Sequence, residues 1–480
     1  MKKYIQLFMF LGLATQLSSQ EVWSLEECVK HSIENSIAIE QSKQGIAFAE
    51  IDYKQSKQER YPNLNGNINV NWNFGRSIDP TTNEFITTTF FSNNYGFNSN
   101  ALLFNGFRIK NSIKQSEINL AAAESDTEQV ERDIALQVAA NFLNVLFAKE
   151  NISLAEKQLV LSQQQLNQIN KLIASGARPA AERLNLEAQI AQSEQMLIGS
   201  QNSLDIAYLN LKQVLRLDPD YQLEIEIPED VPFSTDPDLI TFNEAFKMAL
   251  LNRPDLVASD LRIESAELGV DIAKAFNYPS ISAGGSLGTV YSNQARSITG
   301  TNLETFEQDI VISSNDPTFP IQDVSATIAS QQLSPIFENT GFSTQIDENI
   351  SYGFGIGVSV PIYNRGSTKA GIQRAELNAT TARLQKEQIT ETLKITVQQA
   401  IADARAAKKK KEASAKSLEA QKLAFENAEK RLKIGATNTF EWDSQKTQLE
   451  NAETTNLIDK YDYLFKIKVL EFYLGKPLKF

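Results

Sequence analysis

The stretch NLNGNINVNWNF, residues 63–74, places an asparagine at every odd position and an apolar residue or glycine at every even one. Successive side chains of a β-strand point to opposite faces, so this alternation predicts a strand with one amide face and one apolar face. Asn65, Asn67, Asn69 and Asn71 fall on the amide face. A strand of a soluble sheet turns its apolar face inward and usually covers the other face with charge. Neutral amides opposite aromatic-tipped apolar residues instead favour a strand between water and lipid, with these asparagines lining a pore.

The chain contains an internal repeat. LFNGFRIKNSIKQSEIN (103–119) is similar to IYNRGSTKAGIQRAELN (362–378), 259 residues later. Upstream, Asn35 and Tyr61-Pro62 match Asn252 and Tyr278-Pro279 at an offset of 217. The two offsets differ by 42 residues, which predicts an insertion between the strands of the second repeat, within a long polar loop over 293–349.

Hydrophobic periodicity divides the chain into these repeats. A signal peptide over 1–20 is followed by a first repeat over 21–250 and a second over 251–480. In the first repeat we expect a helix over 24–60, strands over 62–75 and 94–104, a long helix over 107–175 and a return helix over 180–216. In the second we expect a helix over 254–277, strands over 279–292 and 350–363, a long helix over 366–434 and a return helix over 439–474.

The N-terminus predicts export. Lys2 and Lys3 precede a largely apolar run over 4–17, and small polar residues follow it, which is typical of a secretory signal peptide. Loss of the two lysines changes the formal charge from −13 to −15, which argues against nucleic acid as a partner. No later run of about 18 apolar residues occurs, so any membrane crossing must use strands.

The sequence contains too few cysteine and histidine residues for the usual metal sites or for a disulfide. Cys28 is the single cysteine and His31 the single histidine, which excludes an intramolecular disulfide and the usual zinc sites. No nucleophile–base–acid set is visible either. We therefore expect that the protein binds no metal and no cofactor and that it is not an enzyme.

Strand number and helix length point to an assembly. Four strands cannot close a membrane barrel, since the smallest have about eight, whereas three chains would supply twelve. The long helices would extend roughly 100 Å at 1.5 Å per residue, and their faces are rich in Ala, Ser and Gln. Many helices packed closely around a wide tube would fit that composition. An exported coiled-coil spacer or scaffold without a pore is the alternative.

Five segments carry a family resemblance: LFNGFRIKNSIKQSE (103–117), PIYNRGSTKAGIQRAE (361–376), NRPDLVASDLRIESAELGVDIAKAFNYPSIS (252–282), ASGARPAAERLNLEAQ (174–189) and KIGATNTFEWDSQKTQ (433–448). In order and spacing they resemble the TolC family of outer-membrane efflux proteins. The resemblance implies a mixed α/β membrane protein: a homotrimer whose twelve-stranded outer-membrane β-barrel continues into a long periplasmic α-helical barrel. Such a protein is the exit duct of a tripartite efflux or secretion system. Its partners would be outer-membrane lipid, a periplasmic adaptor (membrane-fusion) protein and an inner-membrane pump of the RND or ABC type.

The resemblance also places a gate and a docking site at the two helix-to-helix turns, at the periplasmic tip. The positions that match adaptor-contact motifs are Gly176, Ala177, Arg178, Gly435, Ala436 and Thr437. Glu441 falls where the family has an acidic constriction, Glu182 where a side-chain contact holds the tip shut, and Asp443 beside the position of a second acid, which is Ser444 here. Two structural readings stay open. The glycines can be present because the backbone at a helix end adopts a positive φ, and Glu441 can form a capping pair with Asn438.

Overall fold

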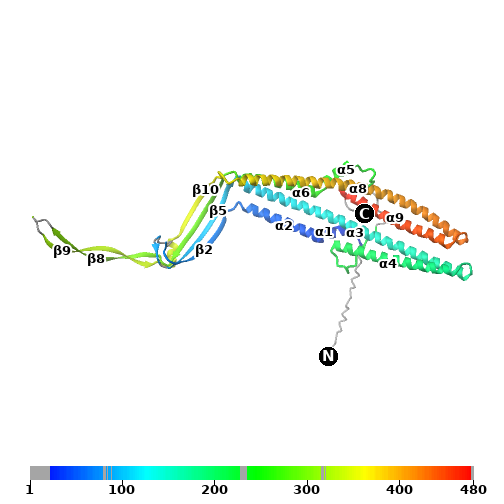
Figure 1. The fold of residues 1–480 in the computed structure, drawn as a ribbon, viewed down its shortest axis with the longest axis horizontal. Helices are drawn as coiled ribbons and strands as arrows, with labels where there is room; N and C mark the ends of the chain where they lie inside the picture. The colour runs from blue at the N-terminus through cyan, green and yellow to red at the C-terminus, as the bar shows by residue number, and fades with distance from the viewer. Residues whose placement is uncertain are drawn as a thin grey trace, which may run out of the picture. The chain divides into compact units, whose positions relative to one another are not determined.

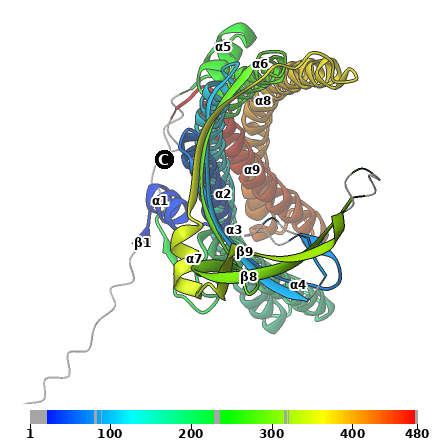
Figure 2. The same ribbon diagram turned by 90° about the vertical axis from the view of Figure 1, so that its left-hand side faces the viewer.

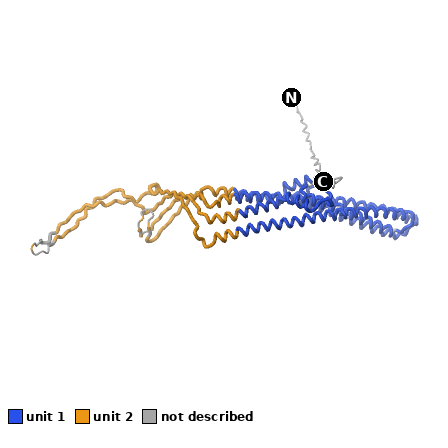
Figure 3. The backbone as a smooth tube through the Cα atoms, turned by 90° about the horizontal axis from the view of Figure 1, so that it is seen from above, with its two compact units in different colours: residues 1–53, 114–267, 375–480 blue, residues 54–113, 268–374 orange. Residues whose placement is uncertain are grey.

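The computed structural model describes residues 22–78, 83, 85–87, 89–227, 235–314, 318 and 321–476. The expected signal peptide lies outside the described residues. Two compact units form, coloured separately in Figure 3: unit 1 (Met1–Tyr53, Lys114–Glu267 and Ala375–Phe480) is helical, and unit 2 (Lys54–Ile113 and Leu268–Arg374) carries most of the strands. Among the helices in the described part of the chain, none combines the length and the hydrophobicity that crossing a membrane requires.

The first repeat begins with strand β1 (Val22–Trp23) and two helices, α1 (Leu25–Asn35) and α2 (Ile37–Gln58). Strands β2 (Asn63–Asn73) and β5 (Phe90–Asn105) follow, with the short β3 (Ser77–Ile78) and β4 (Phe85–Ile86) between them. The long helix α3 (Arg108–Ala174), the return helix α4 (Ala181–Leu215) and strand β6 (Glu224–Ile225), which pairs with β1, complete it (Figure 1).

The second repeat has the same order. Helices α5 (Phe242–Leu251) and α6 (Pro254–Ala275) lead to strands β7 (Ser280–Ser292) and β10 (Ser351–Ser359). The long helix α8 (Ser367–Lys433) and the return helix α9 (Thr439–Tyr473) follow. Between β7 and β10 lie β8 (Arg296–Ser314), β9 (Ile321–Asn339) and helix α7 (Phe342–Glu348).

The prediction of one continuous helix over 24–60 is wrong, because the structure has two helices there, α1 and α2. Ser36 between them has an extended backbone, with φ −65° and ψ 130°. Its carbonyl accepts the N–H of Glu40 at 3.0 Å, so Ser36 both ends α1 and begins α2.

The repeat boundary expected at 250/251 is also wrong, because it falls inside α5, a helix that the sequence analysis did not predict. Thr241 starts this helix in a capping box with Glu244, 217 residues after the identical arrangement of Ser24 and Glu27 at the start of α1. The strand expected over 350–363 is shorter, because Pro361 has no N–H to donate to a ladder.

The segment over 293–349 is not the long loop expected there. Strands β8 and β9, 19 residues each, pair antiparallel as a ribbon, which Figure 2 shows from one end. Threonine, isoleucine and valine recur in both strands and favour the extended backbone. Pairing between two segments is not visible in the composition of either one, so their polarity alone indicated a loop.

The central feature of unit 2 is a four-stranded antiparallel sheet of order β10–β7–β5–β2. One row across it joins Gly66, Phe97, Leu287 and Tyr352, and all the large apolar side chains of β2 and β10 lie on that face. These side chains, together with Phe97 of β5 and Leu287 of β7, are at least 45% exposed in the single chain: Leu64, Ile68, Val70, Trp72, Phe97, Leu287, Tyr352, Phe354, Ile356 and Val358. The shared apolar face predicted from the alternation is thus confirmed by the register.

The opposite face of the sheet carries the amides. Asn65 pairs with Asn98, Asn67 with Gly96 and Asn69 with Asn94. The side chain of Asn98 donates to Oδ1 of Asn67 at 3.1 Å. A Cβ on Gly96 would lie 2.9 Å from that same oxygen, so the glycine leaves room for the asparagine opposite it.

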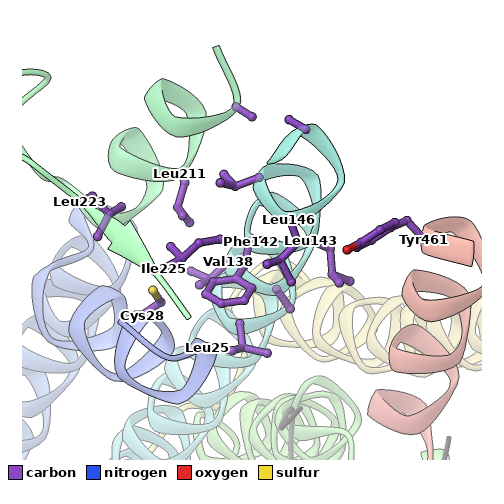
Figure 4. Packing of buried hydrophobic residues seen from close by; sticks show 14 of the residues in the cluster. Leu25, Cys28, Val138, Phe142, Leu143, Leu146, Leu211, Leu223, Ile225 and Tyr461 are labelled. Carbon is purple, nitrogen blue, oxygen red and sulfur yellow. The ribbon is translucent and has the colours of Figure 1, made fainter. Parts of the chain in front are cut away.

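The cores of unit 1 repeat the duplication position by position, although some of the residues differ. In the cluster of Figure 4, Cys28 of α1 packs with Val138 and Phe142 of α3 and Leu211 of α4. The second cluster uses the positions 217 or 259 residues later, which are Ala245, Val397, Ile401 and Leu470. The predicted offsets therefore describe equivalent buried positions in the structure.

The backbone at the entry to each long helix repeats as well. Gly106 and Phe107 before α3, and Arg365 and Gly366 before α8, all have positive φ between 53° and 77°. Glycine occupies the first position in one copy and the second in the other. The shape of the turn is repeated although its glycine has moved.

Burial of Cys28 leads to a first prediction. Its side chain has no exposed surface, and burial raises the pKa of the thiol to about 12. We expect N-ethylmaleimide at about pH 8 to leave Cys28 unmodified in the folded protein and to react fully in urea, measured by mass spectrometry. Fast labelling of the folded protein would contradict the packing of α1 against α3.

Candidate functional site at the helix-hairpin turns

Each long helix ends in a glycine turn, and both turns lie at the same end of unit 1 (Figures 1 and 3). Gly176 has φ 76° and Gly435 has φ 73°. The N–H of Ala177 donates to the carbonyl of Leu172, and that of Ala436 to the carbonyl of Arg431, at 2.9 and 2.8 Å. These bonds form the Schellman motif, in which a left-handed residue closes the helix. A Cβ on either glycine would meet nothing within 4 Å, so the backbone angle rather than crowding requires glycine.

Glu441 lies in the first turn of α9 with its carboxylate directed back to α8. Asn438 caps the helix, because its Oδ1 accepts the N–H of Glu441 at 2.8 Å. The carboxylate accepts hydrogen bonds from the hydroxyl of Thr437 and, at 2.9 Å, from the guanidinium of Arg431. The Thr437 hydroxyl and then the charge of Arg431 hold the pKa of Glu441 below its usual range. The expected helix cap is therefore present, and the carboxylate also joins the two helices of its hairpin.

Glu182 repeats this arrangement at the other turn. Its carboxylate lies 3.5 Å from Arg178, which occupies the position equivalent to Thr437, four residues earlier in the chain. Both side chains are mostly buried, at 17% and 19% exposure, and α4 has no side-chain cap. In each copy the acid is thus held by the residue that follows the glycine and alanine of the turn.

Asp443 does not join the other two acids. Its Oδ1 accepts a hydrogen bond from the side chain of Gln189 at 2.7 Å, which links α4 to α9. Within the described ranges, no group of three histidine, cysteine, aspartate or glutamate side chains could hold a metal ion. The structure thus brings each of the three carboxylates to a different partner within one chain.

A buried lysine behind the turns was missed by the sequence analysis. Lys446 of α9 has no exposed surface and donates to the hydroxyl of Ser162 at 2.6 Å. Its ammonium lies 3.4 Å from Glu450 and 5.9 Å from the ring centre of Trp442. Burial lowers the pKa of Lys446 and raises that of Glu450. The available signal was its spacing, since Trp442, Lys446 and Leu449 follow one helical stripe whose other members are apolar.

The four asparagines predicted to line a pore lie in β2, which belongs to unit 2. Asn65, Asn67, Asn69 and Asn71 are exposed and share one face of the sheet. That face is uncharged along the described length of β2.

The outer membrane efflux protein family model matches residues 29–215 and 245–476. Outer membrane efflux protein BepC of Brucella suis is 19% identical over 407 residues, which are 85% of this chain and 75% of BepC. Cation efflux system protein CusC of Escherichia coli K12 is 24% identical over 261 residues, about half of each chain. Among solved structures, CusC has a TM-score of 0.74 at 18% identity, covering 95% of this chain and 92% of its own. Vibrio cholerae VceC has a TM-score of 0.73 at 15% identity, covering 95% and 96%.

The turn geometry predicts opposite effects for two glycine-to-alanine changes. Gly435→Ala puts a Cβ on a left-handed residue and should lower stability by about 1–2 kcal/mol. Gly199→Ala lies within α4 with nothing within 4 Å of the new Cβ, and should raise stability by about 0.5–1 kcal/mol. Thermal unfolding followed by circular dichroism measures both. Changes of the same sign would show that φ at Gly435 is not the constraint.

Proposed function

Since this chain belongs to the outer membrane efflux protein family, we propose that three copies of it form the exit duct of a tripartite export system. The chain is an outer-membrane protein, and its proposed activity is passive transport rather than catalysis. The observation that carries the proposal is the sheet of unit 2, with two open edges, one apolar face and one amide face.

The edges call for further strands. Strands β2 and β10 each have one neighbour in the chain, and the other side of each has no strand partner among the described residues. In a bilayer such edges are not tolerated, because no water satisfies their N–H and C=O groups. Pairing β2 of one copy with β10 of the next would satisfy both edges, and three copies would close a barrel of twelve strands.

The two faces then have different solvents. The exposed apolar side chains of β2 and β10 would contact lipid, and Asn65, Asn67, Asn69 and Asn71 would line a wet, uncharged pore. An exported coiled-coil spacer without a pore would leave this apolar face without a function, so the duct is favoured.

The helices of unit 1 would form the periplasmic part. Helices α3 and α8 have 67 residues each, or about 100 Å. Their turns, with Gly176, Ala177, Arg178, Gly435, Ala436 and Thr437, would contact a periplasmic adaptor, which in turn binds an inner-membrane pump of the RND or ABC type. CusC is a cation efflux system protein, and the carboxylates at the turns of this chain would favour cations over anions on the way out.

The sheet proposal is tested with neighbouring residues on opposite faces. Ile68→Arg places a charge on the lipid side and should cost roughly 2–4 kcal/mol near the bilayer midplane, so outer-membrane insertion and trimer yield should fall. Asn67→Arg places the same side chain on the water side and should insert normally. Chemical crosslinking of detergent extracts measures the trimer. A clean monomer in the parent, or equal loss in both variants, would overturn the barrel.

The gate is tested separately in planar bilayers. In the trimer, each of Glu182 and Glu441 would form a ring of three carboxylates at the tip, which would attract and retain cations. Glu441→Gln and Glu182→Gln should therefore raise single-channel conductance or weaken block by divalent cations. Glu187→Gln, an exposed acid one turn further along α4, serves as the control. Unchanged conductance and block in both test variants would leave the two acids with a structural role only.

A further inference from the structure

A cavity of about 470 Å³ lies behind the turns, between the α3–α4 hairpin and the α8–α9 hairpin of one chain. Its floor is apolar and includes Leu186 and Trp442, and Phe440 lies at its edge. Its walls are mostly side-chain amides, with the two carboxylates of Glu182 and Asp443. The volume falls within the range of sites that take small organic molecules.

Three polar atoms on this cavity have no hydrogen-bond partner within the described residues: Nε1 of Trp442, Oε2 of Glu182 and Oε1 of Gln165. Trp442 is only 3% exposed, and its indole N–H donates to nothing. Oε2 of Glu182 is buried and accepts from nothing, although Oε1 faces Arg178. Buried polar atoms are almost always satisfied in folded proteins. The cavity therefore offers a ligand one donor at Trp442, one anionic acceptor at Glu182 and one neutral acceptor at Gln165.

The surroundings carry one uncompensated negative charge. Glu182 is paired with Arg178, and Lys446 beneath Trp442 is paired with Glu450. Asp443 accepts a hydrogen bond from the neutral amide of Gln189 and interacts through its charge with Lys446, whose single positive charge is already paired with Glu450. One added positive charge would bring these groups to neutrality, and an aromatic ring beside it would add a cation–π contribution.

We propose that this cavity binds a small organic monocation, an amine with an apolar body and one hydrogen-bond acceptor. The ammonium would lie at Oε2 of Glu182 and the carboxylate of Asp443, and the body would lie against Leu186 and Trp442. The acceptor would take the indole N–H. Because Glu182 is on α4 and Trp442 on α9, the occupant would hold the two hairpins together. The inference concerns one chain and does not depend on the trimeric duct.

The probe is lidocaine, a tertiary amine with an aromatic body and an amide carbonyl, in its protonated form. Isothermal titration calorimetry on the purified full chain in detergent should give saturable binding of one molecule per chain, with a Kd on the order of 100 μM. The matched neutral ligand, 2,6-dimethylacetanilide, has the same aryl amide without the amine and should bind at least about tenfold more weakly. Equal binding of the two would overturn the proposal.

Variants locate the site. Glu182→Gln keeps the shape but removes the charge, and should weaken lidocaine binding about tenfold. Trp442→Phe replaces the indole with a smaller aromatic ring that has no N–H, and should weaken lidocaine binding by a smaller factor. Glu187→Gln should bind as the parent does, and thermal unfolding confirms that each variant is folded. Unchanged affinity in folded Glu182→Gln would overturn the assignment. Conductance and crosslinking are independent readouts, so failure of this site and failure of the duct are distinguishable.

Discussion

A strand at the edge of a sheet presents backbone N–H and C=O groups that need partners, and this requirement governs the whole molecule. The sheet β10–β7–β5–β2 has such an edge at each end and an apolar face between them. In water the edges and the apolar face would promote aggregation, and in a bilayer the edge groups would have no water to bind. Four strands are too few to remove the edges by closure. In sequence, a helix of 22 residues precedes each strand pair and a helix of 67 residues follows it, so each copy places its strands between helices.

The duplication explains how one chain supplies two strand pairs of matching geometry. The repeats share the capping box of their first helices, their core positions and their turn conformations. The side chains of Asn35 and Asn252, for example, each donate to the carbonyl four residues earlier at 2.9 Å. At exposed positions, by contrast, the two repeats share little sequence. At the turns, Arg178 and Thr437 are chemically different residues that hold the equivalent acids Glu182 and Glu441. Both copies therefore hold an acid at the start of the return helix, and each copy holds it with a different side chain.

Local periodicity was sufficient to predict the faces of the strands, because alternation with period 2 needs no knowledge of the partner. The family resemblance placed both glycine turns, and glycine at a helix end has a specific backbone role that fits them. Local periodicity was not sufficient where a distant partner decides the outcome. Strands β8 and β9 exist as regular structure because they pair with each other. Lys446 is buried because Ser162, 284 residues away, and Glu450 satisfy it. The break at Ser36 depends on the backbone of one residue, and composition does not record that.

The equal lengths of the two hairpins restrict how such a chain can change. Helices α3 and α8 have 67 residues each, and α4 and α9 have 35 each. One residue inserted into any of them would advance its turn by about 1.5 Å and rotate every later side chain by about 100°. The two repeats have accordingly drifted in sequence with no gap between β5 and α4 or their counterparts. The 42 extra residues entered between β7 and β10, where a ribbon can lengthen without moving a helix. Growth of this protein is therefore confined to the segments that join its strands, and its helices can change in sequence but not in length.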